Sequence, residues 1–386
     1  MDRREFLLSG GAAACLPAIP VPAAGRRERL AITDIELFCV APPLRPEVLM
    51  NGDPASSENA NIPKFILRVH TDSGIVGLGE THRMPGGLNS DRAVALRRTA
   101  AALRGANVLD FNLSRLRLPY ETDSFAFEAA FYDIAGKAAG WPVYRLLGGL
   151  AQRKVLVNYW CGKNLRPEQL REVAERAVAG RFQGIKMKRS YPLARALEIF
   201  ASVSPGLRVT VDLMGYYPGD ILPAAREMEA VGNLLTLEDP VKIGDLEAGR
   251  ALQQQLRTPI ASHLYINAKG VRGMVESIAA QACSVFNLGA GTMAGFVAQS
   301  YLAGEAGIPV WRGSAHELGI LDAALLHCCA AAPNCTYPSD LLSYQRVDDL
   351  IVEPVRIEDS YAIVSDKPGL GVELDMDAVR RYEVKS

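Results

Sequence analysis

Short apolar runs alternate with longer amphipathic segments from about residue 155 onward. The runs read "VLVNYWC", "GIKMK", "LRVTVDL", "LLTLEDP", "TPIASH", "SVFNLG" and "IPVWRG". Between the polar residues at their C-terminal ends the intervals are 24, 26, 25 and 24 residues, through Lys188, Asp212, Glu238, His263 and Asn287. One strand with a returning helix needs about this length, so the pattern predicts a modified (β/α)8 barrel of the TIM type. A loose α/β sheet with scattered charges does not explain why polar residues recur in phase.

The region before these repeats has a different pattern. "ITDIELFCV" and "KFILRVHT" are typical of strands, "DSGIVGLGE" of a hairpin turn entering a third, and "FAFEAAFYDIAGKAAGWPVYRLLGG" of a helix that stops at Gly148-Gly149. These elements predict an N-terminal α+β capping domain over residues 29–150, followed by the barrel over residues 151–355. A polar, proline-rich loop over residues 41–63 is long enough to be a functional lid or a disordered segment.

Residues 1–24 have the features of an export signal. Arg3 and Arg4 precede a short apolar stretch and an alanine-rich exit, an arrangement that resembles a twin-arginine signal. We therefore expect a protein exported folded to the periplasm, although a frayed amphipathic N-terminus is the alternative. The apolar stretch is too short for a permanent membrane span. Six cysteines follow the signal without CxxC spacing, which favours buried thiols over a disulfide or zinc framework.

Composition narrows the class of function. The 386 residues are 49% hydrophobic and 22% charged, with a formal net charge of -1. This is the composition of an ordinary globular protein, and no dense Lys/Arg run is present to bind nucleic acid or an anionic membrane surface. We therefore exclude nucleic acid as a partner.

Candidate chemistry lies at the ends of three consecutive predicted strands. Asp212 and Glu238 each end an apolar run and would point into the same barrel mouth, where two close carboxylates need a cation or a shared proton. Mg²⁺, with its preference for oxygen ligands, is a natural partner. Lys186 and Lys188 lie two apart, hence on one face of the preceding strand. A lysine beside another ammonium and a metal loses its proton more easily and can act as a general base, but salt bridges to the carboxylates would equally explain both lysines.

Several motifs together resemble the enolase superfamily, on the mandelate racemase and muconate lactonizing enzyme side. They are "TDSGIVGLGE", "FEAAFYDIAGKAAGWPVYRLLGG", the "KMK" of a K-x-K motif, "VDLM", "LEDP" and "PGLGVELD". The resemblance covers nearly all of the chain after the signal. It implies that residues 356–386 return to the capping domain, that Asp212 and Glu238 bind a divalent metal, that Lys188 is the base, and that Lys186 stabilises charge on a substrate carboxylate.

Two departures from the family pattern affect the expected chemistry. His263 stands where the family has a third, usually acidic or amide, metal ligand, so Mn²⁺ or another divalent ion becomes an alternative to Mg²⁺. The alternative for His263 is a hydrogen-bonded residue of the mouth. On the opposite face Asn287 replaces the acid or lysine of related enzymes, and Ala315 stands where a histidine is expected, with His316 and Glu317 just beyond.

A one-base reaction fits this pattern. Lys188 would take the α-proton of a hydroxylated carboxylate and a β-hydroxyl would leave, with His316 either as the acid that protonates it or as an ordinary loop histidine. We therefore predict a lyase that dehydrates a sugar acid. The alternatives are a racemase or epimerase of a 2-hydroxy or amino acid and a catalytically impaired exported sugar-acid binding protein.

The remaining expectations are secondary. Selectivity for the small carboxylate substrate is expected to come from the 41–63 loop and "GETHRMPGG", where His82 is a further residue that would face the site. His327 lies in an apolar helical run and is predicted to be a core residue. Relatives of this kind are often symmetric, so we expect a homo-oligomer.

Overall fold

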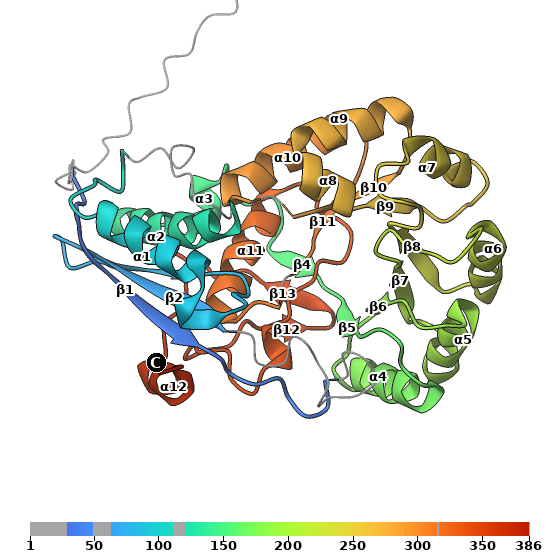
Figure 1. Cartoon of the computed structure of the whole chain (residues 1–386), viewed down its shortest axis with the longest axis horizontal. Coiled ribbons are helices and arrows are strands. Elements are labelled where there is room, and N and C mark those ends of the chain that lie inside the picture. Colours follow the sequence, from blue (N-terminus) through green and yellow to red (C-terminus); the bar gives the residue numbers. More distant parts are fainter. Residues whose placement is uncertain (1–28, 49–62, 111–120, 290, 315, 386) are drawn as a thin grey trace, which may run out of the picture.

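The structure is a computed structural model that describes residues 29–48, 63–110, 121–289, 291–314 and 316–385. The predicted export signal, most of the 41–63 loop and Ala315 lie outside these residues. Figure 1 shows an antiparallel sheet with its helices at one end of the molecule and a curled parallel sheet ringed by helices at the other. Both predicted domains are therefore present.

The capping domain is built on three antiparallel strands in chain order, with two long helices packed against them. Glycines let the second helix lie close to the third strand: a Cβ at Gly79 would fall 2.1 Å from the carbonyl oxygen of Ala126. The elements are β1 (Ile32–Val40), β2 (Lys64–Thr71), β3 (Val76–Glu80), the 3-10 turn η3 (Gly87–Asn89), α1 (Asp91–Ala102), α2 (Glu121–Ala139) and the short α3 (Val143–Leu146).

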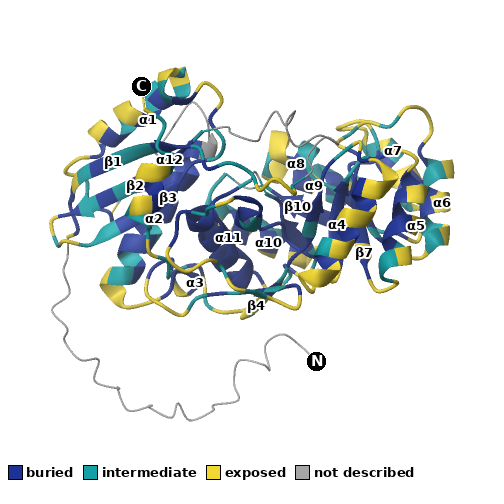
Figure 2. Cartoon of the chain, turned by 90° about the horizontal axis from the view of Figure 1, so that it is seen from below, coloured by how far each residue is buried: buried dark blue, intermediate teal, exposed yellow. Residues whose placement is uncertain are grey.

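Seven parallel strands form the barrel sheet, each beside its neighbour in the chain, with the helices outside. Figure 2 shows buried strands within this ring, and exposed residues on the outward faces of helices such as α4, α5 and α7. The strands are β5 (Tyr159–Cys161), β6 (Gly184–Lys188), β7 (Arg208–Asp212), β8 (Leu234–Glu238), β9 (Ile260–Ser262), β10 (Val285–Leu288) and β11 (Val310–Arg312). The helices are α4 (Pro167–Ala179), α5 (Leu193–Val203), α6 (Leu222–Val231), α7 (Leu246–Gln253), α8 (Leu264–Lys269), α9 (Val271–Ala280), α10 (Met293–Glu305) and α11 (Gly319–Ala331).

A short extended segment closes the ring between β11 and β5. The backbone N–H of Ser339 donates to Leu156 O at 2.8 Å, and that of Asp340 donates to Arg312 O at 2.8 Å. The N–H of Asn158 in turn donates to Ser339 O at 3.0 Å. Residues 339–340 thus occupy the eighth position of the barrel without forming a regular strand.

The run "VLVNYWC", predicted as one strand, is divided between two sheets. Its first part, β4 (Lys154–Leu156), pairs with β13 (Tyr361–Ile363), which also pairs with β12 (Ile357–Glu358). Its second part is β5 of the barrel. The break falls at residues 157–158, because Val157 N–H donates to Ser360 O at 2.7 Å while Asn158 bonds to Ser339.

The C-terminal segment returns to the capping domain after the turn η5 (Ser343–Gln345) and the small sheet. Helix α12 (Met376–Tyr382) packs near β1, and the N–H of Val384 donates to Cys39 O at 2.8 Å. Within the described ranges, no helix has the length and apolar character needed to cross a bilayer.

His327 and the cysteines belong to the core. His327 is buried in α11, where Nδ1 accepts from the Tyr144 N–H at 3.2 Å and Nε2 donates to Leu370 O at 3.1 Å. The six cysteines of the described chain are free and buried, as the spacing predicted. They are Cys39, Cys161, Cys283, Cys328, Cys329 and Cys335.

Two buried acidic side chains of the capping domain attach it to helix N-termini of the barrel. Glu80 at the end of β3 accepts the N–H groups of Leu318 (2.6 Å) and Leu321 (2.9 Å) at the start of α11. Its charge is balanced by Lys64, whose Nζ lies 2.7 Å away. Glu128 of α2 accepts two backbone N–H groups at the start of α10 in the same way. A carboxylate satisfies free N–H donors and the positive end of the helix dipole at once.

Removing Glu80 should therefore destabilise the protein strongly. We expect Glu80→Ala to lower the free energy of unfolding by about 3–5 kcal/mol, because it leaves Lys64 charged and unpaired in the interior together with two unsatisfied N–H groups. Glu36→Ala is the matched control, since Glu36 forms an ion pair with Arg68 on the half-exposed face of the same sheet. The control should cost about 1 kcal/mol or less. Equal losses in urea unfolding would contradict this role of Glu80.

Because Glu128 is buried, we expect the stability of the protein to depend on pH. Burial raises the pKa of Glu128 to about 7 despite the two N–H donors. The folded state therefore keeps a proton that the unfolded state loses near pH 4.5, and stability falls as the pH rises from there to about 7. Glu128→Gln cannot lose this proton, so its stability relative to the wild type should increase by on the order of 2 kcal/mol from about pH 5 to about pH 8. A difference in unfolding free energy that stays constant across this range would disprove the assignment.

Candidate active site

The predicted site residues meet at the C-terminal ends of neighbouring barrel strands. The strand register places Lys188 of β6 beside Asp212 of β7, and Asp212 beside Glu238 of β8. Because parallel strands present their C-terminal ends at one mouth, these side chains gather without any special loop geometry.

Lys186 is enclosed by three carboxylates. Its Nζ lies 2.9 Å from Glu238 Oε2, 3.0 Å from Asp340 Oδ2 and 3.9 Å from Asp212 Oδ2. Burial disfavours the charge on Lys186, but Asp340, Glu238 and Asp212 outweigh it and raise the pKa of this ammonium. Lys186 therefore holds its proton throughout the physiological range and acts as a fixed positive charge.

Lys188 occupies a different environment two residues further along the strand. Among the described residues it forms an ion pair only with Asp212, and its side chain is 23% exposed, whereas that of Lys186 is 4% exposed. Although burial favours the neutral acid, Lys188 and Lys186 lower the pKa of Asp212 to about 2. Of the two lysines, Lys188 is thus the one that a substrate in the barrel mouth can reach.

Carboxylate oxygens of Asp212, Glu238 and Asp239 form a group that fits a metal ion. One oxygen from each lies within 4.8 Å of the others, and all three residues are buried. Burial, followed by the charge of Glu238, raises the pKa of Asp239 to about 7, and a nearby cation would favour the ionised form of this carboxyl. A set of hard oxygen donors suits Mg²⁺ or Mn²⁺.

His263 lies beside this group without belonging to it. Its Nδ1 donates to the backbone oxygen of Asn287 at 3.1 Å, and its Nε2 accepts from Asn267 Nδ2 at 3.0 Å. Burial lowers the pKa of the imidazole, which is neutral. Nε2 would have to exchange Asn267 for the ion in order to bind it, so metal ligation by His263 stays a prediction.

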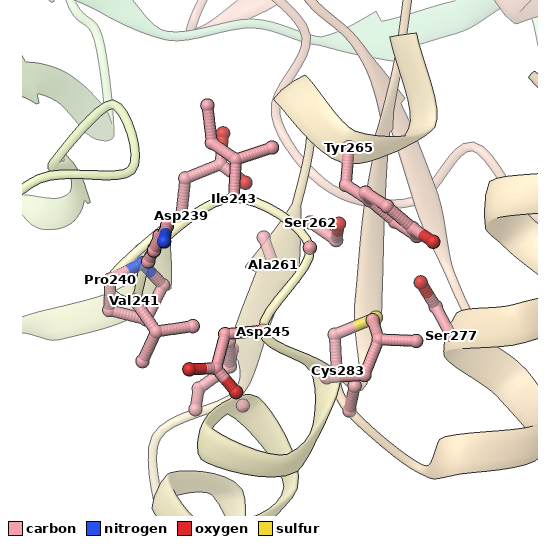
Figure 3. Close-up of a pocket in the computed structure, with 16 residues that line it drawn as sticks. Asp239, Pro240, Val241, Ile243, Asp245, Ala261, Ser262, Tyr265, Ser277 and Cys283 are labelled. Carbon is pink, nitrogen blue, oxygen red and sulfur yellow. The ribbon is translucent and has the colours of Figure 1, made fainter. Parts of the chain in front are cut away.

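Asp239 also fixes the backbone that carries His263. Its two carboxylate oxygens accept the N–H groups of His263 (2.9 Å) and Leu264 (3.0 Å) at the start of α8. Behind it lies a cavity of about 40 Å³ between the loop after β8 and helix α9. Figure 3 shows Asp239, Ser262, Tyr265, Ser277 and Cys283 around this cavity. It has room for only a few water molecules, so the substrate must bind elsewhere.

Asn287, on β10, supports the site through a hydrogen bond to Glu238. Its Nδ2 donates to Glu238 Oε1 at 2.7 Å. The amide fits closely against Gly313, where a Cβ would come within 2.6 Å of Asn287 Oδ1. A neutral amide neither takes up nor releases a proton in this range, so this strand holds a carboxylate in place and offers no acid or base.

His316 and His82 lie where the barrel meets the capping domain. The His316 ring stands edge-on to Trp160 of β5, with centroids 5.2 Å apart, and its buried Nδ1 has no hydrogen-bond partner among the described residues. Burial, followed by the charge of Arg83, holds the pKa of His316 well below its usual value. His82 packs edge-on to Phe125, and its pKa is lowered by burial and then by Arg312. Both rings are neutral.

Two members of the charged group were missed by the sequence analysis. Asp239 directly follows Glu238 in "LEDP" and was available as a candidate. Asp340 lies in "YPSDLL", which has no apolar run to mark a strand, although its 28-residue separation from Arg312 is close to the barrel interval. That interval was the only signal for Asp340.

Comparison with known families agrees with this architecture. The chain matches "Mandelate racemase / muconate lactonizing enzyme, N-terminal domain" over residues 32–148 and "Enolase C-terminal domain-like" over residues 169–378. The protein is therefore a member of the mandelate racemase and muconate lactonizing enzyme family of the enolase superfamily, as the motifs indicated.

Individual relatives catalyse different reactions. An N-succinylamino acid racemase of Thermus thermophilus is 30% identical over 66% of this chain and 69% of its own length. A D-xylonate dehydratase of Haloferax volcanii is 26% identical over 85% of this chain and 87% of its own length. The structure of a muconate lactonizing enzyme from Pseudomonas fluorescens aligns with a TM-score of 0.80 at 23% identity, covering 92% of this chain and all of that one. The structure of a Thermobispora bispora enolase complexed with magnesium and formate aligns with a TM-score of 0.75 at 24% identity, covering 92% of each chain. The relatives support an enzyme and leave open whether it is a lyase or an isomerase.

The carboxylate group predicts the outcome of a metal-binding experiment. Asp212→Asn and Glu238→Gln should each weaken Mg²⁺ or Mn²⁺ affinity by at least about 100-fold in calorimetry, because each removes a charged oxygen donor. Asp34→Asn, on the exposed face of the capping domain, should leave affinity unchanged. If His263 is a ligand, His263→Ala will weaken binding as much as Glu238→Gln. If it only supports Asn287, the loss will be about tenfold. Unchanged affinity in both acid variants would refute this metal site.

Proposed function

We propose that this protein is a metal-dependent enzyme that removes the α-proton of a hydroxylated carboxylate, and that its reaction is the dehydration of a sugar acid. The observation that carries the proposal is the unequal environment of the two lysines. Lys186 is a buried, permanently charged group, while Lys188 is reachable and bound to one carboxylate. Such a pair separates charge stabilisation from proton transfer.

Each group has a distinct task in this proposal. Lys188 must first release a proton to solvent and then takes the α-proton of the substrate. The fixed charge of Lys186 stabilises the negative charge that develops on the substrate carboxylate. Asp212, Glu238 and Asp239 would hold the metal. When bound, a divalent cation supplies further positive charge to the substrate carboxylate.

The opposite face supports dehydration over racemisation. A racemase needs a proton acceptor on each side of the α-carbon, and Asn287 at the end of β10 is an amide bonded to Glu238. In dehydration, the electron pair left at the α-carbon forms the new double bond, and the β-hydroxyl leaves as water after taking a proton. His316, next to Trp160 at the mouth, is the candidate to deliver that proton, and because its ring is neutral at rest it must first take up a proton from solvent. The D-xylonate dehydratase among the relatives supports the same reaction class.

Racemisation or epimerisation remains the second candidate. The N-succinylamino acid racemase relative favours it, and so does a neutral His316 that follows β11 and is able to accept a proton from the other face. A third possibility is a sugar-acid binding protein without turnover. It would not explain why so many charged groups are buried at the barrel mouth.

We also propose that the chain is exported folded to the periplasm and works there as a homo-oligomer. The support for export is the Arg3-Arg4 pair followed by a short apolar stretch. The proposal of a homo-oligomer rests on the symmetric assembly that is common among relatives of this kind.

Isotope exchange in D₂O tests the proposed chemistry. The protein is supplied with Mg²⁺ and a panel of sugar acids including D-xylonate, and mass spectrometry records both deuterium uptake at the α-carbon and loss of water. Lys188→Ala should reduce both by about 10³-fold or more, because it removes the base. Lys242→Ala, an exposed lysine in the loop after β8, is the control and should have no effect.

His316→Asn separates the two steps. We expect it to retain α-deuterium exchange and to lose water elimination by about 10²-fold or more, because the leaving hydroxyl lacks its acid. Inversion at the α-carbon without loss of water would establish the racemase instead. Binding of an acid without exchange or elimination would establish a binding protein.

A further inference from the structure

Aromatic side chains gather on the loops that directly follow the two catalytic strands. Tyr191 comes three residues after Lys188, and Tyr216 and Tyr217 come four and five residues after Asp212. We call Arg189, Tyr191, Tyr216 and Tyr217 the tyrosine rim. The loops after barrel strands lie on the face that carries the active site, so the rim stands beside the mouth.

Contacts within the rim hold it together. The rings of Tyr191 and Tyr217 lie 6.0 Å apart between centroids, and the Arg189 guanidinium lies 5.3 Å from the centre of the Tyr216 ring. Tyr217 is partly buried against the barrel core and anchors the group. Arg189 Nη1 reaches the backbone oxygen of Leu213 at 3.5 Å, which joins the loop after β6 to the loop after β7.

The rim exposes more aromatic surface than the fold requires. Tyr191 is 45% exposed and Tyr216 is 59% exposed. Met214 (41%) and Ile243 (47%) extend the same apolar region, since a Cβ on Gly215 would meet Ile243 at 2.5 Å. A contiguous exposed apolar patch of this kind marks a surface that binds something.

The chemistry of the rim matches that of a sugar ring. Tyrosine presents a flat apolar face and a hydroxyl at its edge, and a pyranose ring has apolar C–H faces with hydroxyls around its rim. Arg189 adds a hydrogen-bond donor beside the stacking surface. Either face of a sugar ring could stack on such a surface, and the ligand would not need a charged group there.

We propose that the tyrosine rim is a subsite for a second sugar ring, joined to the acid that reacts at Lys188. The substrate is then the acid end of a saccharide longer than one unit. This inference rests on the proposed function, because a sugar ring at the rim extends the reacting sugar acid outward along the loops of β6 and β7.

A matched set of sugar acids tests the subsite. Cellobionate and maltobionate each consist of gluconate with one glucose ring added, so their affinities relative to gluconate measure what the second ring contributes. Calorimetry with Mg²⁺, on the full chain carrying Lys188→Ala to prevent turnover, should show at least one of the two binding about three- to tenfold more tightly than gluconate. Tyr216→Ala and Tyr191→Ala should each reduce that ratio toward one.

Tyr301→Ala is the control, because Tyr301 is 50% exposed on α10, outside the barrel. It should leave the ratio unchanged. If gluconate binds and neither disaccharide acid binds more tightly, the rim proposal fails while the sugar-acid function stands. If none of the three acids binds, both fail. A preference that persists in the rim variants also overturns the subsite. The subsite is likewise overturned if the rim variants change the oligomeric state in sedimentation experiments and leave the affinity ratio unchanged. That result would make the rim a contact between copies of the chain.

Discussion

The ammonium group of Lys186 is the interaction on which the barrel mouth depends. Three buried carboxylates from β7, β8 and the eighth position lie within 4 Å of this one cation. Each buried ion costs several kcal/mol in desolvation, and the carboxylates would repel one another without a positive charge between them. Because its partners come from separate parts of the chain, Lys186 also holds the ring together. Asp340 in particular lies in a segment with little regular strand structure, and its ion pair adds to the few backbone bonds that close the barrel there.

The two lysines show how two residues on one strand face acquire different chemistry. Both are on β6, and the period of the strand directs both inward. Depth separates them: Lys186 lies among carboxylates on several sides, whereas Lys188 lies nearer the open end and meets one. From the sequence alone, catalytic roles and salt bridges are alternatives for these lysines. In the structure the ion pairs exist, and they are the means by which one lysine is kept charged and the other is left reachable.

Much of the fold followed from the spacing of apolar runs, because a buried parallel strand must be continuously apolar and its crossover has a minimum length. The same rule explains what was missed. Residues 339–340 close the barrel through backbone bonds to Leu156, Asn158 and Arg312, and they lie in "YPSDLL", where no apolar run exists to be recognised. "VLVNYWC" looked like one strand since both halves are apolar, and only distant partners at Ser339 and Ser360 divide it. The environment of His263 likewise depends on Asn267 and Asn287, whose side-chain directions no periodicity reveals.

The capping domain enters the chemistry through the helices that it holds. Glu80 accepts N–H groups at the start of α11, and the preceding residues, between β11 and α11, include His316. The backbone that presents His316 is therefore set by a carboxylate of the other domain, with Lys64 supplying the balancing charge. The loops after β6 and β7, in contrast, belong wholly to the barrel. In the proposed reaction, a substrate would thus meet one group whose position depends on domain docking, His316, and others that are built into the strands, Lys186 and Lys188. In the proposed reaction, the strand residues would hold the reacting carboxylate, while loops that can vary without disturbing Lys186 would contact the rest of the substrate.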